Sequence, residues 1–226
     1  MARKRQSQGS CMYCGKEMSK GGISRHLKSC SARQDAMADA AGDKEQALYH
    51  LQVQDAERGD YWLHLEMSGN ATLQQLDKYL RAIWLECCGH LSTFFIGGAW
   101  SGMEVAMNRQ IDRVFDMTDV LDHIYDFGAS SETKIKYVGK RKGMPLTKHP
   151  IALLARNAIP HAPCQECGQP AAWLCMECIY EHERSGFLCD AHGKEHPHDD
   201  YGGVMVYVNS PRVGMCGYDG RAEPPY

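Results

Sequence analysis

Paired cysteines and histidines constrain the fold of this chain more than any other feature. Eleven of the 226 residues are cysteine, and most stand in C-x-x-C or C-x-x-H pairs with further histidines at ligand spacing. The charged first residues precede no apolar segment, so we expect no secretory signal, no membrane anchor and a cytoplasmic location. Thiols stay reduced there, and the spacing therefore predicts metal sites, not disulfides.

The first cluster has the spacing C-x2-C-x11-H-x3-C, formed by Cys11, Cys14, His26 and Cys30. Two thiolates on a tight turn, with a histidine and a cysteine on one helical turn, suit the tetrahedral coordination of zinc. A unit this small cannot fold on apolar burial alone, so we expect zinc to supply its folding energy. The pattern resembles single C2HC zinc fingers of nucleic-acid-binding and adaptor proteins.

The N-terminal segment is basic although the whole chain carries a net charge of −3. Such a local excess favours contact with a polyanion. A lone finger reads only about three base pairs, so we expect recognition of shape or phosphate. A protein partner and a purely structural role stay open. The candidate nucleic-acid-binding residues are Arg3, Lys4, Arg5, Lys20, Arg25 and Lys28.

The second cluster offers eight ligands in four consecutive pairs, with the first and third pairs expected on one ion and the second and fourth on another. The order resembles the B-box zinc module, which implies protein–protein contact. The alternatives for one ligand of the second ion are His182, Asp199 and Asp200. A simpler hypothesis is a single zinc ion held by the first four cysteines of this cluster, Cys164, Cys167, Cys175 and Cys178. Four protein ligands per ion indicate structural sites. The eight are Cys164, Cys167, Cys175, Cys178, Cys189, His192, His196 and His198.

Between the clusters, residue patterns predict an α+β domain in which an antiparallel sheet packs against one main helix. Thr72 and Gln75 form a capping box before a helix expected to run to Cys87, and Gly89 offers its stop. Strands are expected there over 48–53, 61–67, 91–96, 114–117, 123–127 and 133–138, with the first two forming a hairpin, and a further strand over 204–208 follows the second cluster.

These patterns divide the chain into five segments. We expect a C2HC finger with a basic arm over 1–32, a linker over 33–46 and the α+β domain over 47–157. A B-box-like module over 158–200 and a C-terminal strand and tail over 201–226 complete the chain. The tail is expected to dock against the second module or the sheet.

Three motifs of the middle segment resemble the Ri-plasmid ORF-3-like family of plasmid and insertion-element passenger proteins. They are the run from Asn70 to Trp84, the stretch from Gly89 to Phe94, and Tyr125-Asp126-Phe127-Gly128. The resemblance covers roughly residues 47–140 and implies a small α+β domain associated with mobile elements. Ala129-Ser130-Ser131 departs from the family's acidic and tryptophan positions.

The sequence favours a zinc-binding adaptor or regulatory protein that is not an enzyme. We expect two or three Zn²⁺ ions per chain, contact with DNA or RNA through the finger, and a protein partner for the second module. One alternative is an enzyme with a site near Asp77, His90, His123 and Asp126. Another is a partner-directed inhibitor that binds no nucleic acid.

Overall fold

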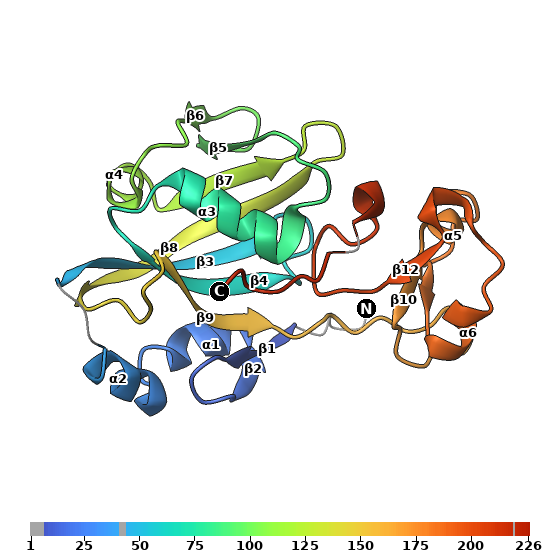
Figure 1. Cartoon of the computed structure of the whole chain (residues 1–226), viewed down its shortest axis with the longest axis horizontal. Coiled ribbons are helices and arrows are strands. Elements are labelled where there is room, and N and C mark those ends of the chain that lie inside the picture. Colours follow the sequence, from blue (N-terminus) through green and yellow to red (C-terminus); the bar gives the residue numbers. More distant parts are fainter. Residues whose placement is uncertain (1–6, 41–43, 219) are drawn as a thin grey trace.

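A computed structural model describes residues 7–40, 44–218 and 220–226. Among these residues, an antiparallel nine-stranded sheet has the order β2-β1-β9-β4-β3-β8-β7-β5-β6 (Figure 1). With few and short helices beside it, this sheet confirms the expected α+β class. Its strands are β1 (Gln8–Cys11), β2 (Glu17–Ser19), β3 (Gln46–Asp55), β4 (Trp62–Ser68), β5 (Ser92–Ile96), β6 (Met103–Val105), β7 (Val120–Tyr125), β8 (Ser131–Gly143) and β9 (Ile151–Asn157).

The main helix, α3 (Leu73–Leu80), lies across one face of the sheet and continues into a π-helical turn, η1 (Arg81–Leu85) (Figure 1). Leu73, Leu76 and Leu80 are fully buried in the principal core. At the helix start, the Thr72 N–H donates to Gln75 Oε1 at 2.9 Å, as a capping box requires. The helix ends before Cys87 because Glu86 takes an extended backbone.

One expected strand was wrong. Residues 114–117 are not a strand, because α4 (Ile111–Phe115) occupies that position and buries Ile111 and Val114 at helical spacing. Helix α2 (Ser31–Ala38) spans the end of the expected finger and the first part of the expected linker, residues 33–46. Strand β9 was not anticipated. No helix in the described ranges is long and apolar enough to cross a membrane.

The N-terminal finger is built into the main sheet. Strand β1 pairs with β9, placing Gly9 opposite Asn157, and α1 (Lys20–His26) packs beneath these strands (Figure 1). Ile23 and Leu27 share a core with Trp62. A side chain at residue 9 would meet the Arg156 carbonyl oxygen at 2.2 Å, so only glycine permits this approach. The finger therefore has apolar packing against the sheet, which a free-standing unit of its size would lack.

The second module lies at one end of the molecule (Figure 1). It contains a three-stranded antiparallel sheet of order β11-β10-β12 with short helical turns at its ends. Its strands are β10 (Trp173–Cys175), β11 (Phe187–Leu188) and β12 (Val204–Val206), and its helices are α5 (Met176–Tyr180), α6 (Asp190–Lys194) and the 3-10 turn η2 (Asp200–Gly202). The expected strand over 204–208 thus ends at Val206.

The tail after β12 docks against both the module and the α+β domain. Ser210 Oγ donates to the Trp84 carbonyl oxygen at 2.6 Å, and Arg212 is fully buried. Val213 packs on the module core formed by Leu174 and Met176. Gly214 has φ 84°, and a side chain there would collide with Met176 Sδ at 2.3 Å. The 3-10 turn η3 (Met215–Gly217) follows.

Candidate metal centres

The expected geometry of a zinc site follows from its bond lengths. Tetrahedral zinc with Zn–S near 2.3 Å and Zn–N near 2.0–2.1 Å holds two sulfurs about 3.8 Å apart and a sulfur and nitrogen about 3.5 Å apart. Two cysteines in a disulfide instead have sulfurs about 2.05 Å apart. The separations between ligand atoms therefore distinguish the two kinds of site.

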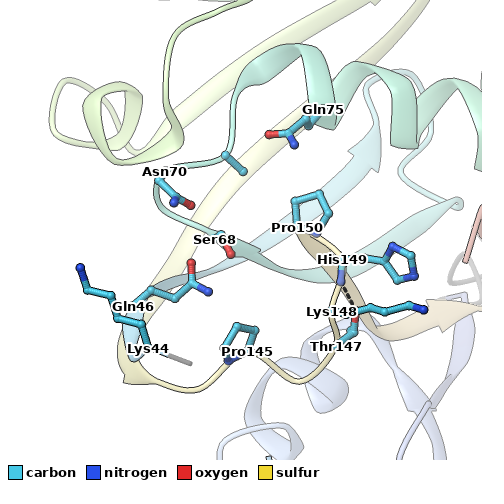
Figure 2. Close-up of a pocket in the computed structure, with 11 residues that line it drawn as sticks. Lys44, Gln46, Ser68, Asn70, Gln75, Pro145, Thr147, Lys148, His149 and Pro150 are labelled. Carbon is cyan, nitrogen blue, oxygen red and sulfur yellow. Dashed lines mark hydrogen bonds between the residues drawn. The ribbon is translucent and has the colours of Figure 1, made fainter. Parts of the chain in front are cut away.

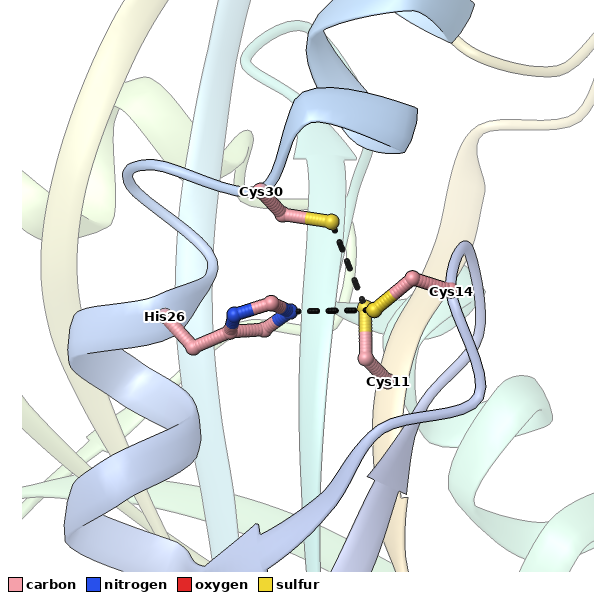
Figure 3. Close-up of side chains that lie close together, drawn as sticks. All are labelled: Cys11, Cys14, His26 and Cys30. Carbon is pink, nitrogen blue, oxygen red and sulfur yellow. Dashed lines mark hydrogen bonds between the residues drawn. The ribbon is translucent and has the colours of Figure 1, made fainter.

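The first cluster joins the β1–β2 turn to the end of α1 and the start of α2. Cys11 Sγ lies 3.9 Å from Cys30 Sγ, and Cys14 Sγ lies 3.2 Å from His26 Nε2 (Figure 3). All four ligand atoms lie within 4.8 Å of one another. Cys11 and Cys30 are buried and Cys14 is exposed. These separations fit a tetrahedral metal ion and are too long for disulfides.

The turn that carries Cys11 and Cys14 is closed by backbone hydrogen bonds. Cys11 N–H donates to the Lys16 carbonyl oxygen at 3.1 Å, and Gly15 N–H donates to the Cys11 carbonyl oxygen at 2.9 Å. A hydrogen bond from the Lys16 backbone N–H lowers the pKa of the Cys14 thiol. The turn therefore favours the thiolate form that binds metal.

The second module brings its eight candidate ligands together in two sets. Cys164, Cys167, Cys189 and His192 form one, and Cys175, Cys178, His196 and His198 form the other. In each set all ligand atoms lie within 4.8 Å of one another. This is the grouping of first with third pair and second with fourth that a cross-brace requires.

The separations in the two sets also match tetrahedral coordination. In the first set, Cys167 Sγ and Cys189 Sγ lie 3.7 Å apart, and Cys164 Sγ lies 3.6 Å from His192 Nδ1. In the second set, Cys175 Sγ lies 3.5 Å from His198 Nδ1. Three thiolates with one imidazole, and two of each, are donor sets that zinc accepts.

Backbone N–H groups favour a thiolate in the first of these sets. Burial raises the pKa of Cys164, but backbone hydrogen bonds from Cys189, Glu166 and Cys167 outweigh it and hold that pKa at about 6. At neutral pH this favours the thiolate form of Cys164, which is the form that binds a cation.

The second set has an acidic neighbour. His198 turns Nδ1 toward the cysteines, while its Nε2 lies 3.7 Å from Glu177 Oε1. Such a carboxylate fixes the orientation of a metal-bound imidazole. His182 stacks on His198 and groups with it and Glu177. The two four-ligand sets form without His182, Asp199 or Asp200, the alternatives considered from the sequence.

One further cluster was missed in the sequence. Cys87, Cys88, His90 and Cys216 also place one ligand atom each within 4.8 Å of the others. From the sequence, at least one of Cys87 and Cys88 was expected to be a packed core thiol and His90 to be a structural histidine. A compact C-C-x-H stretch and an unassigned cysteine were the available signals, but their meeting depends on how the tail docks.

The candidate nucleic-acid-binding residues are divided in the structure. Arg3, Lys4 and Arg5 lie outside the described residues. Lys20 Nζ donates to Gln54 Oε1 at 3.0 Å and to the Gly59 carbonyl oxygen at 3.2 Å, so it fastens the finger to the β3–β4 hairpin. Arg25 and Lys28 are exposed.

The side chains of the alternative enzyme site make contacts inside the fold. His123 is fully buried and contacts Asp77 Oδ1 at 3.0 Å and Thr133 Oγ1 at 3.2 Å. Asp126 pairs with Arg212. A cavity of about 640 Å³ lies elsewhere, lined by Lys44, Gln46, Asn70, Lys148 and His149 among others (Figure 2). Its lining contains none of the four candidate catalytic residues.

The comparisons with known proteins give no functional lead. No family model matches the chain, and no curated protein matches it. A solved structure, the protein of unknown function MM3350 from Methanosarcina mazei Go1, is similar over 46% of this chain with a TM-score of 0.40 and 19% identity. The match spans 66% of that protein, slightly under two thirds of its length.

Proposed function

We propose that this chain is a zinc protein with three structural ions, acting as an adaptor between a nucleic acid and a protein partner. The observation that carries the zinc assignment is the gathering of twelve Cys and His residues into three four-ligand sets, each within 4.8 Å. Four protein ligands fill a tetrahedral zinc ion and leave no position for a reactive water. Structural ions, not catalytic ones, suit these sets.

The second module supports this assignment through its small size. Its buried residues form two small clusters, one of which consists of Cys164, Cys175, Cys178 and Leu188. So little apolar burial cannot fix a unit with short strands and helical turns. Structural zinc contributes about 10–16 kcal/mol to the folding of comparable small units, which is enough to hold this one.

Contact with nucleic acid is proposed for the finger. Arg25 and Lys28 are exposed on or beside α1, and the basic residues Arg3, Lys4 and Arg5 precede the finger in sequence. Lysine and arginine bind phosphates without reading bases, so the expected contact is independent of sequence.

A protein partner is proposed for the second module. The rings of Tyr180 and Tyr201 are in tilted contact, with centroids 5.3 Å apart, and each residue is at least half exposed. Exposed tyrosines are typical of protein interfaces because they offer an apolar ring and a polar hydroxyl. We further propose a cytoplasmic location and, from sequence motifs alone, kinship of the middle domain with the Ri-plasmid ORF-3-like family and its mobile elements.

The nucleic-acid proposal is tested by binding of duplex DNA, single-stranded DNA and RNA over a series of salt concentrations. Arg25→Glu and Lys28→Glu should weaken binding, and each lost duplex phosphate contact should reduce the slope of log K against log salt by about 0.9. Lys142→Glu, at an exposed lysine of β8, is the matched control and should retain binding. If Arg25→Glu and Lys28→Glu bind as tightly as the control Lys142→Glu, the proposed contact of the finger with nucleic acid is wrong.

A further inference from the structure

The fourth Cys/His cluster lies where the C-terminal tail meets the α+β domain. Cys87, Cys88 and His90 follow η1, and Cys216 belongs to η3 more than a hundred residues later. All four ligand atoms lie within 4.8 Å of one another. Neither of the two metal motifs in the sequence includes any of these residues.

The separations within this cluster are those of ligands around one metal ion. Cys88 Sγ lies 3.6 Å from Cys87 Sγ and 3.7 Å from Cys216 Sγ. His90 Nε2 lies 3.0 Å from Cys88 Sγ and 3.4 Å from Cys216 Sγ. Tetrahedral zinc requires about 3.8 Å between sulfurs and about 3.5 Å between sulfur and nitrogen. The sulfurs are too far apart for disulfides.

The loop that carries three of these residues is held in shape by Tyr125. The backbone N–H groups of Cys87 and His90 both donate to the Tyr125 hydroxyl at 3.4 Å. The same hydroxyl donates to Glu86 Oε1 at 3.1 Å. Because one buried tyrosine fixes the loop at both ends, little ordering remains to be done when an ion binds.

The surroundings also suit the charge of such a site. Three thiolates and one imidazole around a divalent ion carry a net charge of −1. The buried Arg212 Nη2 lies 3.4 Å from Cys87 Sγ, and Arg81 Nη2 donates to the His90 carbonyl oxygen at 2.7 Å. Two guanidinium groups therefore lie where they offset the negative charge. Asp126 Oδ2, 3.4 Å from His90 Nε2, is itself paired with Arg212.

The backbone of the tail adopts an unfavourable conformation at the cluster. Cys216 has φ 51°, in the left-handed region that costs an L-residue roughly 1–2 kcal/mol. Such a conformation persists where other contacts compensate for it. A bond from the Cys216 sulfur to a metal ion is a contact of this kind.

We propose that Cys87, Cys88, His90 and Cys216 form a fourth zinc site, which ties the C-terminal tail to the α+β domain. Thiolate and imidazole donors favour zinc over the oxygen-binding cations magnesium, calcium and manganese. None of the three cysteines in this cluster is buried, whereas each of the other three sets contains at least one buried cysteine, so this ion is expected to be the most accessible to chelators.

Counting bound zinc by native mass spectrometry of the full chain tests the proposal. The wild type should carry four ions, and Cys216→Ser and Cys88→Ser should each carry three. Met215→Leu, a change beside the site that removes no ligand, is the matched control and should carry four. Cys14→Ser, in the finger, should also lose one ion, which shows separately that the count responds to the sites already described.

Three results would overturn the fourth site. One is that Cys216→Ser and Cys88→Ser bind as many zinc ions as the wild type, while Cys14→Ser binds fewer. Another is the mass loss of two hydrogens that a Cys88–Cys216 disulfide produces. The third applies if Cys216→Ser does not fold. Retention of four ions by Cys88→Ser then excludes the site.

Discussion

Arg212 Nη2 lies 2.5 Å from Asp126 Oδ2, and both side chains are buried. Arg212 Nη1 also donates to the Ala129 carbonyl oxygen at 2.9 Å and to Ser131 Oγ at 3.0 Å. Burial raises the pKa of Asp126, but the Arg212 guanidinium and the backbone N–H groups of Gly128 and Ala129 lower it overall. The tail is therefore held by a buried ion pair beside the fourth cluster.

Replacing Arg212 by methionine should destabilise the protein by about 3–5 kcal/mol, because Asp126 is left buried without its partner charge. The measurement is the free energy of unfolding of the metal-loaded chain in denaturant. Arg221→Met, at an exposed arginine of the same tail, should change it by less than about 0.5 kcal/mol. Adding Asp126→Asn to Arg212→Met should restore part of the loss, and full additivity would contradict the pairing.

A second buried network fastens helix α2 to the sheet. Glu66 accepts from Arg33 Nη2 at 2.9 Å and from Arg141 Nη2 at 2.6 Å. Glu66→Ala leaves two guanidinium groups without their carboxylate and should cost about 3–5 kcal/mol. Amide hydrogen exchange in α2 should accelerate with it. Glu45→Ala removes only an exposed contact to Lys142 and should leave both readouts near wild type. Unchanged exchange in Glu66→Ala would show that Arg33 does not tether α2.

Glu177 is expected to tune one metal site without binding the ion. Glu177→Gln should weaken zinc at the set containing His198 by about 10–100-fold, because the imidazole loses the carboxylate that orients it. Competition with a chromophoric chelator measures this. Glu181→Gln, on the residue after α5, contacts Tyr201 and should leave affinity unchanged. Equal affinities in both variants would assign Glu177 no role at the site.

The paired histidines His50 and His64 predict a loss of stability in acid. Their rings meet at 2.8 Å between Nε2 and Nδ1. Burial, followed by nearby positive charge, lowers the pKa of His50 to about 4 and that of His64 to about 3. The unfolded chain binds these protons at about pH 6.5. Between pH 6.5 and about 4 the unfolded state therefore binds more protons, and stability falls as pH falls. Above pH 6.5 both histidines are neutral in the folded and the unfolded state, so neither makes the free energy of unfolding depend on pH.

The test of this prediction compares unfolding free energies of wild type and His64→Gln from pH 7.5 to 5. One such histidine contributes a slope of up to about 1.4 kcal/mol per pH unit below pH 6.5, and the variant should lose that part. Metal release in acid affects both proteins, so the difference between them isolates His64. His161→Gln, at an exposed histidine, should keep the wild-type slope. A His64→Gln slope equal to wild type would contradict the account.

Local signals predicted the parts of the fold whose determinants are close in sequence. The β3–β4 hairpin and the start of α3 at Thr72 follow from short patterns of apolar and capping residues. Strand β9 and helix α4 did not, because short apolar runs fit strand and helix equally well. The pairing of β1 with β9 joins segments far apart in the chain, which spacing alone cannot reveal.

The same contrast holds for the candidate sites. Three ligand sets arise within motifs of about 20 to 35 residues, and ligand spacing was sufficient to group them. The fourth brings Cys216 to Cys88 only because Arg212 and Ser210 dock the tail on the α+β domain. A motif search does not detect a contact made by tertiary packing. The resemblance of the middle domain to the Ri-plasmid ORF-3-like family stays a prediction from its motifs.

The most direct test of the metal assignment at both ends of the chain is zinc content site by site, together with amide exchange after chelation. Cys14→Ser, Cys167→Ser and Cys178→Ser should each lose one ion relative to wild type. Chelation should expose the amides of residues 164–206, while β3, β4 and β8 stay protected. A chain that remains fully protected after its metal is removed, or whose cysteines prove to be joined as disulfides, would contradict the assignment.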